Sequence, residues 1–419
     1  MKERAQVVII GGGVVGCSLA LSLARRISGV VVLEREGIGS QASGSNYGMV
    51  WQQTRLAGFD LDMARRSLRM YRELVSEEFD IDIEYEERGG MTVFHTPEQK
   101  AVMEVVVRQK RDQGIPVRLI DGREARELEP ELSPEVVGST YCAEEAQLNP
   151  ILTTLAFARA AARRGADIRT GIEVRGIRVE RGRVRAVLTG LGEIEAQWVV
   201  NAAGPWSRQV AAMAGIDLPV FPQRLESLVT ERLSRRLISR VLQGGREVTA
   251  EEVESPEKVL SFALELPPGA GEESLPREPL DRSIFPFLKP TVSKNVVIGT
   301  TSEFVGHDKG VLPRALHLMA KKAVQIVPAL KDARIIRTWA NFVPFTFDSL
   351  PILGKVPGVD GFILACGHAH ALSHVPPTAE ALAHLIIDGK ADIPIEDASI
   401  ERFTGREGQG TPAQPGGVS

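Results

Sequence analysis

The sequence predicts an α/β fold built around a parallel sheet, and two observations near the N-terminus lead to this prediction. A short β-branched run, 7-VVII-10, meets a glycine-rich turn, and apolar residues at helical spacing follow at once. A second β-branched run, 30-VVVL-33, comes next. Strand, turn, helix and strand in this order are the unit from which parallel sheets are built.

The glycine-rich turn has the spacing Gly11-x-Gly13-x-x-Gly16, which in this context is a Rossmann-type dinucleotide fingerprint. One glycine makes the tight turn, one lets the backbone approach a pyrophosphate, and one lets helix and strand approach closely. The helix N-terminus offers free N–H groups to the phosphates. Glu34 ends the second strand, where its carboxylate can accept hydrogen bonds from a ribose and disfavours NADP.

Three further segments suit an extended, phosphate-bearing ligand, although the fingerprint alone does not separate FAD from NAD. The stretch 37-GIGSQASGSNYGMVW-51 is dense in glycine and serine, and 198-WVVNAAGPWS-207 is a strand followed by small residues. The stretch 362-FILACGHAHALSHVPPTAEALAHLI-386 predicts a strand, a glycine turn and a helix. Pro376 and Pro377 fit the start of that helix, whose N-terminal dipole favours negative charge on a reduced flavin.

Composition sets bounds on the class of protein. A chain of 419 residues is long enough for two domains, and a net charge of −4 without a basic stripe argues against a nucleic-acid partner. Cys17, Cys142 and Cys366 are far apart and form no CxxC pair, so we expect neither disulfides nor a zinc site, and a cytoplasmic location. The sequence contains no run of about 20 apolar residues, which is the length that would predict a membrane-spanning helix.

Together these segments resemble the FAD-dependent D-amino acid oxidase superfamily, and most of all its glycine oxidase, sarcosine oxidase and proline or hydroxyproline dehydrogenase branch. The similarity runs from Val7 to about Phe403. The other matching segments are 284-IFPFLKP-290, 296-VVIGTTSE-303 and 339-WANFVPFTFDSLPILG-354. The resemblance implies non-covalent FAD, because the flavin-anchoring cysteine of monomeric sarcosine oxidases has no counterpart in 337-RTWANF-342.

The motifs and the resemblance together imply a set of cofactor-binding residues. By analogy, Val174 lies near the adenine and Arg35 flanks the adenosine. The full set is Gly11, Gly13, Val14, Val15, Gly16, Glu34, Arg35, Ser40, Ala42, Ser43, Asn46, Gly48, Met49, Val174, Ala203, Gly204, Trp206, Gly367 and His368.

The candidate catalytic residues are His370, Arg55, Trp339 and Met49. A histidine beside the flavin can tune the protonation of an amine or the charge of the flavin. We expect no metal site, because no carboxylate or cysteine completes a ligand set close to the histidines.

Two positions depart from the family pattern where relatives bind a substrate carboxylate. Glycine-oxidase-like members carry an arginine where this chain has Val343, and sarcosine oxidases carry a lysine near the position of Ser373. A buried carboxylate needs a cationic partner. Arg55 is therefore our first candidate for that role, and Lys289 is another.

The resemblance implies a discontinuous domain organisation. Residues 1–88, 141–216 and 345–404 would form the FAD-binding domain. Residues 89–140 and 217–344 would form a substrate domain with an antiparallel sheet over the flavin, including strand residues 258–266 and a loop at 267–279. The Gly- and Pro-rich stretch 405–419 reads as a flexible tail.

The implied function is FAD-dependent oxidation of an amine or amino acid resembling glycine, sarcosine or proline. A neutral amine passes a hydride from the adjacent C–H to flavin N5, and the imine hydrolyses. Oxygen or an electron-transfer partner accepts the electrons. Two alternatives stay open: a catalytic β-like subunit of a hetero-oligomeric dye-linked amino acid dehydrogenase, and a flavin-binding subunit without its own substrate. Homo-oligomers and hetero-oligomers are both compatible with the sequence.

Overall fold

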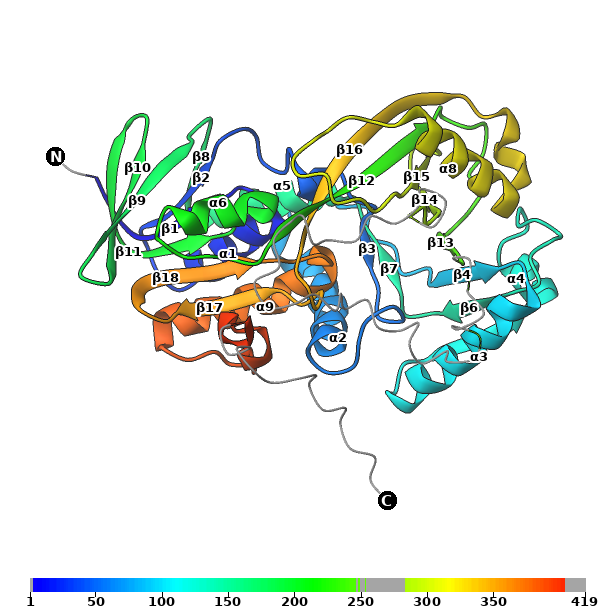
Figure 1. Cartoon of the computed structure of the whole chain (residues 1–419), viewed down its shortest axis with the longest axis horizontal. Helices are drawn as coiled ribbons and strands as arrows, with labels where there is room; N and C mark the ends of the chain where they lie inside the picture. The colour runs from blue at the N-terminus through cyan, green and yellow to red at the C-terminus, as the bar shows by residue number, and fades with distance from the viewer. Residues whose placement is uncertain (1–2, 246–247, 249–252, 254–282, 404–419) are drawn as a thin grey trace, which may run out of the picture.

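The structure, a computed structural model, describes residues 3–245, 248, 253 and 283–403. The predicted strand at 258–266, the predicted loop at 267–279 and the predicted tail at 405–419 lie outside the described residues. Two eight-stranded sheets form the frame of the molecule, one in each half of the view in Figure 1. Among the described residues, no helix has the length and apolar character needed to span a bilayer.

The first sheet has a parallel centre, as the sequence predicted. Its strand order is β17-β18-β10-β11-β1-β2-β8, and β9 pairs with β10. The run from β18 through β11, β1 and β2 to β8 is parallel throughout. The strands are β1 (Glu3–Ile10), β2 (Val30–Glu34), β8 (Asp167–Thr170), β9 (Val174–Glu180), β10 (Arg183–Thr189), β11 (Gly192–Asn201), β17 (Ile352–Val356) and β18 (Val359–Cys366).

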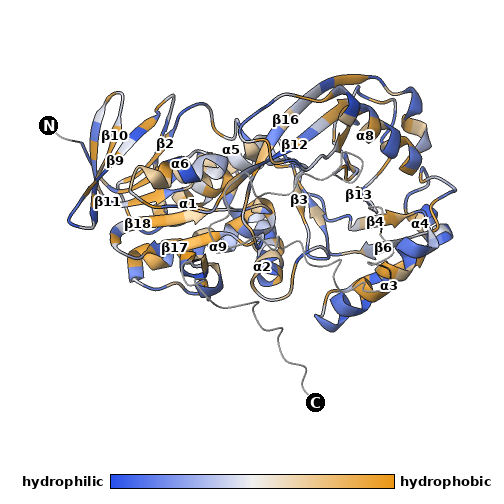
Figure 2. Ribbon diagram, in the orientation of Figure 1, coloured by the Kyte–Doolittle hydropathy of each residue, from blue (hydrophilic) through white to orange (hydrophobic). Residues whose placement is uncertain are grey.

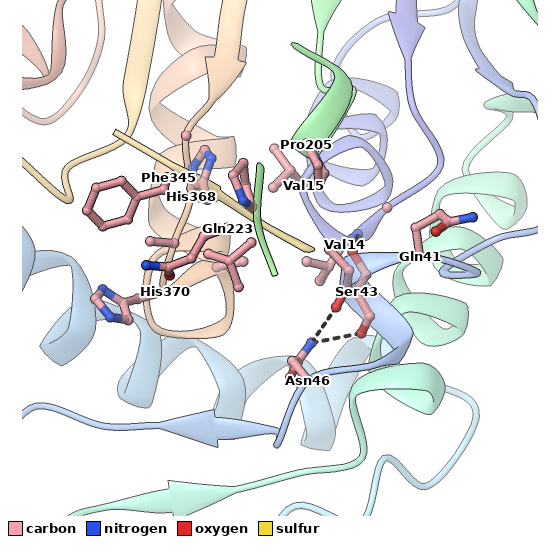
Figure 3. Close-up of a pocket in the computed structure, with 18 of the residues that line it drawn as sticks. Val14, Val15, Gln41, Ser43, Asn46, Pro205, Gln223, Phe345, His368 and His370 are labelled. Carbon is pink, nitrogen blue, oxygen red and sulfur yellow. Dashed lines mark hydrogen bonds between the residues drawn. The ribbon is translucent and has the colours of Figure 1, made fainter. Parts of the chain in front are cut away.

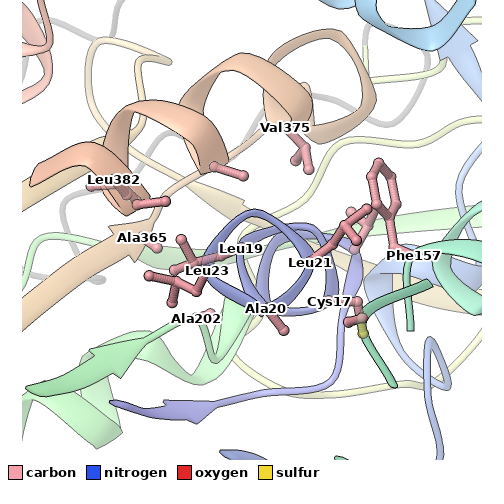
Figure 4. Close-up of a cluster of buried hydrophobic side chains, with 14 of the residues drawn as sticks. Cys17, Leu19, Ala20, Leu21, Leu23, Phe157, Ala202, Ala365, Val375 and Leu382 are labelled. Carbon is pink, nitrogen blue, oxygen red and sulfur yellow. The ribbon is translucent and has the colours of Figure 1, made fainter. Parts of the chain in front are cut away.

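Helices cover both faces of this sheet. On one face, α1 (Val14–Ala24) lies between the sheet, α5 (Pro150–Arg163) and α9 (Ala371–Asp388), while α2 (Phe59–Glu73) packs against α9. Figure 4 shows Leu21 of α1 beside Phe157 of α5, while Leu19 and Leu23 lie on the other side of α1, toward Ala365 of β18. On the other face, α6 (Ser207–Ala212) packs on β11. Apolar residues fill β18 from Phe362 to Cys366, part of the orange strand in Figure 2, because both faces of the strand are covered there.

The second sheet is antiparallel except for one pair, β4 with β13, which confirms the predicted class. Its order is β16-β12-β15-β14-β13-β4-β6-β5. The strands are β4 (Gly90–Phe94), β5 (Val117–Asp121), β6 (Gly138–Cys142), β12 (Phe221–Thr230), β13 (Val241–Gly244), β14 (Phe287–Pro290), β15 (Val296–Gly299) and β16 (Ile335–Phe345). The accompanying helices are α3 (Pro97–Asp112), α4 (Gly122–Leu128) and α8 (Pro313–Ile326).

A two-stranded ribbon, β3 (Met49–Val50) with β7 (Ala146–Gln147), lies between the two large sheets in the view of Figure 1. The predicted domain boundary between residues 140 and 141 falls inside β6, a strand of the second sheet. The domain ranges themselves remain predictions.

The start of α9 differs from its prediction. The helix begins at Ala371, so Pro376 and Pro377 lie inside it and not in its first turn. Each proline removes one backbone donor from the helix. The helix continues because its turns from Leu372 to Thr378 are buried against neighbouring elements, and burial outweighs the local penalty.

Candidate functional site

A cavity of about 880 Å³ is lined by residues from both large sheets. It brings together most of the residues that the sequence singled out. The predicted residues on its wall are Gly11, Gly13, Val14, Val15, Glu34, Arg35, Ser40, Ala42, Ser43, Asn46, Gly48, Met49, Arg55, Val174, Ala203, Gly204, Trp206, Gly367, His368 and His370.

The glycine-rich turn is shaped by close backbone contacts. Gly11 has φ of +116°, and a Cβ atom there would lie 2.4 Å from the carbonyl oxygen of Ala202. Gly16 does not line the cavity, but a Cβ on it would lie 2.0 Å from the carbonyl oxygen of Gly11. No side chain caps α1 at its N-cap residue, Gly13. The positive end of α1 is therefore available to a phosphate group.

Glu34 is held in place by main-chain donors. The backbone N–H of Gly12 donates to Glu34 Oε2 at 2.7 Å, and that of Glu36 donates to Oε1 at 2.8 Å. The carboxylate lines the cavity just beyond the first strand–helix turn. Each carboxylate oxygen keeps a further lone pair, so the group can still accept hydrogen bonds from ribose hydroxyls.

The serine-rich loop after β2 covers the start of α1. Ser43 Oγ accepts a hydrogen bond from the N–H of Val14 at 2.9 Å. Asn46 Nδ2 donates to the carbonyl oxygens of Ala42 and Ser43, and Asn46 Oδ1 accepts from the N–H of Gly48. Figure 3 shows Ser43 and Asn46 on the side of the cavity formed by Val14. The loop is therefore fixed by its own amide group where an extended ligand would pass.

Beyond Glu34, the part of the cavity expected to hold the adenosine is formed by aromatic and cationic side chains. The Arg35 guanidinium lies 4.1 Å from the centre of the Trp206 ring, and His307 stacks on the same ring with centroids 5.2 Å apart. Flat groups of this kind suit an adenine, and the nearby Val174 supplies an apolar wall.

The turn between β18 and α9 carries two histidines with unpaired ring nitrogens. The Nδ1 atoms of His368 and His370 have no hydrogen-bond partner. Burial lowers the pKa of His368 to about 3, and burial followed by the charge of Arg55 lowers the pKa of His370 well below its ordinary value. Both rings are therefore neutral at neutral pH, and either can accept or donate a hydrogen bond.

Arg55 brings a buried cation to the cavity wall. The residue is 5% exposed, and its Nη2 donates to Thr54 Oγ1 at 2.8 Å, while Nη1 lies 3.8 Å from Asp60 Oδ1. Its Nε and Nη1 atoms have no hydrogen-bond partner. Buried guanidinium donors left unpaired at a cavity are a natural position for an anionic ligand group.

Neither of the two positions at which relatives carry a carboxylate-binding arginine or lysine has a cationic side chain in this chain. Val343 and Ser373 both line the cavity, as the resemblance implied. The Ser373 hydroxyl is already used, because it accepts from the N–H of Trp51 at 3.1 Å and donates to the carbonyl oxygen of the same residue. The alternative cation, Lys289, is not a wall residue, and its ammonium donates to the carbonyl oxygen of Leu148 at 3.0 Å.

Trp339, a candidate catalytic residue, is likewise not on the wall. Its indole Nε1 donates to the carbonyl oxygen of Ser45 at 3.3 Å, so it packs against the outside of the serine-rich loop. Met49 does line the cavity, on β3.

Apart from Val343 on β16, sequence reasoning assigned no site role to the wall residues of the second sheet. Gln223 donates to Ser302 Oγ at 2.8 Å, and Tyr47 shares a 2.7 Å hydrogen bond with Ser227. Figure 3 shows Gln223 and Phe345 near His370. Further wall residues are Leu225, Gln243, Ile284, Phe285, Phe287, Thr300, Thr301, Phe304 and Pro344. The only available signal was that several of them belong to the matching segments around residues 284–303 and 339–354.

The cavity fits FAD at its phosphate and adenosine ends, because glycine positions admit the ligand and the N-terminus of α1, whose Val14 N–H is bonded to Ser43, faces it. In the part of the chain that the structure describes, no three metal-binding side chains converge.

The chain is similar to several known proteins. Glycine oxidase from Pseudomonas putida is 26% identical over 413 residues, covering 96% of this chain and 99% of that protein. Mitochondrial sarcosine dehydrogenase from Homo sapiens is 26% identical over 415 residues, and the match spans 96% of this chain but only 42% of that protein. The crystal structure of L-proline dehydrogenase from P. horikoshii has a TM-score of 0.79 at 25% identity, covering 96% of this chain and 99% of that one.

The family described as FAD dependent oxidoreductase matches residues 6–385, which is most of the chain. That range contains the glycine turn, the serine-rich loop and the histidine turn that together line the cavity. The chain belongs to this family of FAD-dependent oxidoreductases.

Proposed function

We propose that this protein oxidises a small amine-bearing carboxylic acid of the glycine, sarcosine or proline kind, with FAD as its cofactor. The observation that carries the proposal is the Arg55 guanidinium, which lies buried on the cavity wall with two nitrogens unpaired. A substrate carboxylate supplies the acceptor atoms that these donors lack. The names of the similar proteins point to the same substrate class.

FAD, when bound, supplies the acceptor for a hydride from the carbon next to the amine. The chain itself supplies position and exclusion of water. Arg55 would hold the carboxylate, and the neutral ring of His370 would accept or donate a hydrogen bond at the amine. Val343 and Phe345 line the cavity with apolar surface, which keeps water from this region.

The cofactor in this proposal is held without a covalent bond. Cys366 lines the cavity, but burial raises the pKa of its thiol to about 12, and its Sγ donates to the carbonyl oxygen of Asn201 at 3.1 Å. A thiol in that state is a poor nucleophile. Acid precipitation should therefore leave intact FAD in the supernatant, whereas flavin in the pellet would contradict a non-covalent site.

The similar proteins differ in their electron acceptor, because their names include both oxidases and dehydrogenases. Peroxide formed on substrate addition would identify an oxidase. Turnover with an artificial dye and not with oxygen would identify a dehydrogenase that passes electrons to a partner.

The substrate proposal is tested by anaerobic bleaching of the bound flavin. Glycine, sarcosine, proline and larger secondary amines are compared with their esters at matched concentration. We expect one or more acids to bleach the flavin and their esters to do so far less well. If no amine of either kind bleaches the flavin, the proposal is wrong and a flavin-binding subunit without its own substrate is the better description.

A further inference from the structure

We propose that Lys110, a residue of helix α3 outside the cavity wall, is a positioning residue that holds Arg55 in place for the substrate carboxylate. The inference rests on the proposed function and adds to it a residue of α3, a helix that packs on the second sheet. No local motif marked Lys110 in the sequence.

Lys110 is an unusual lysine because it is 2% exposed. Its ammonium donates a hydrogen bond to the main-chain carbonyl oxygen of Arg55, which lies 55 residues away in the sequence. The N–H of Arg55 is also engaged, since it donates to the carbonyl oxygen of Gln52 at 2.9 Å. Both polar groups of the Arg55 peptide backbone are thus fixed, and one of them is fixed by α3.

The opposite side of Arg55 is held by Asp60, which is 3% exposed. Asp60 Oδ2 accepts from the N–H of Leu56 at 2.7 Å, and Oδ1 lies 2.6 Å from His374 Nε2. Burial alone would raise the pKa of Asp60, but the charge of Arg55 and the His374 hydrogen bond outweigh it and keep the pKa below its ordinary value. The loop carrying Arg55 is therefore bonded to α2 and α3, and α2 is bonded in turn to α9.

The charges in this cluster favour an anion. Burial and then repulsion from Arg55 lower the pKa of Lys110 to about 8, so two cations that destabilise each other are buried together. Asp60 is the acidic group that pairs with Arg55, and Glu145 does not add a full negative charge, because burial raises its pKa to about 8. A carboxylate bound to Arg55 would relieve the repulsion between the two cations. The cluster therefore favours substrates that carry an acid group.

The structure contains a matched control for Lys110. Lys289 is also a buried lysine, 6% exposed, whose ammonium donates to a main-chain carbonyl oxygen and whose pKa burial lowers to about 8. Its acceptor belongs to Leu148 and not to Arg55. Removing either ammonium costs stability in a similar way, but only Lys110 is bonded to the residue that would bind the carboxylate.

The experiment compares Lys110→Met and Lys289→Met holoenzymes with the unmodified protein. We expect Lys110→Met to raise KM for the acid substrate about tenfold, with kcat changed less than about twofold and flavin content unchanged. KM for the ester of the same substrate should not change. Lys289→Met should match Lys110→Met in loss of thermal stability without the rise in KM.

A double-mutant cycle separates positioning from a general defect. In an Arg55→Ala background, Lys110→Met should raise KM no further, because the residue through which Lys110 acts is gone. If Lys110→Met does not fold, Lys110→Gln is measured with the same expectation, since its shorter side chain carries no ammonium.

Three results would overturn the inference: an unchanged KM for the acid, an equal rise with Lys289→Met, or additive effects of Lys110 and Arg55. Failure of the proposed function is visible separately, because the unmodified protein would then show no flavin bleaching with any amine.

Discussion

The cofactor end and the substrate end of the cavity are built in different ways. At the cofactor end the wall comes from stretches that are continuous in sequence, around residues 11–15, 39–49 and 202–206, and much of it is main chain or small side chains. At the substrate end the wall comes from side chains on β12, β13 and β16, far apart in the sequence. A dinucleotide thus fits a local backbone pattern, whereas the end that we propose for the substrate is lined by residues that only the fold brings together.

The two ends also differ in how they place charge. The cofactor end offers the partial charge of a helix N-terminus and the partly buried carboxylate of Glu34. The substrate end buries whole charges, with Arg55, Asp60 and Lys110 each no more than 5% exposed. Buried charges are costly without partners, so this end depends more on substrate and on tertiary contacts.

The largest effect is expected from Gly16→Ala, which tests whether backbone shape governs the cofactor end. A Cβ at Gly16 would lie 2.0 Å from the carbonyl oxygen of Gly11, so helix and strand must separate. We expect purified protein with little or no flavin and a lower Tm. Gly37→Ala is the control, because nothing lies within 4 Å of a Cβ there. Normal flavin content in Gly16→Ala would mean that the close approach is not required.

Arg55→Ala tests the substrate end. Loss of a buried charge partner costs about 2–5 kcal/mol, so kcat/KM for an acid substrate should fall roughly thirtyfold or more. Flavin content should not change, because Arg55 lies away from the glycine turn. Arg55→Lys should also be impaired, since a lysine cannot form two parallel bonds to a carboxylate. Kinetics indifferent to both substitutions would remove Arg55 from the site.

Glu34→Ala sharpens the contrast by removing the one charged group expected at the ribose. The affinity for FAD should weaken by about 1.5–3 kcal/mol, which is roughly tenfold or more, with KM for substrate unchanged in the saturated enzyme. Glu36→Ala is the neighbouring control, since Glu36 is exposed. Fluorescence titration of the apoprotein with FAD measures both, and an unchanged affinity would place the ribose elsewhere.

The smallest effect is expected on stability, from Glu145→Gln. Burial raises the pKa of Glu145 from 4.5 to about 8, so the folded state holds a proton that the unfolded chain releases above pH 4.5. This group therefore lowers stability as the pH rises between those two values, by at most about 1.4 kcal/mol per pH unit. Glu145→Gln stays neutral and should flatten that decline in urea unfolding measured at several pH values. Glu144→Gln, at an exposed position, should leave it in place.

The sequence by itself determined the cofactor end. The glycine spacing, Glu34 and the serine-rich loop are local patterns between residues 11 and 49, and hydrogen bonds from Gly12 to Glu34 and from Val14 to Ser43 join them. The order of its motifs also predicted the parallel sheet, and the family resemblance implied the antiparallel one.

Only the tertiary structure decided which side chains meet at the substrate end. In the structure Trp339 and Lys289 do not line the cavity, whereas Gln223 and Phe345 do. It also bonded Lys110 to Arg55 across 55 residues of sequence. The physical reason is range: backbone geometry and capping act within a few residues, whereas buried side-chain contacts depend on how whole strands and helices pack.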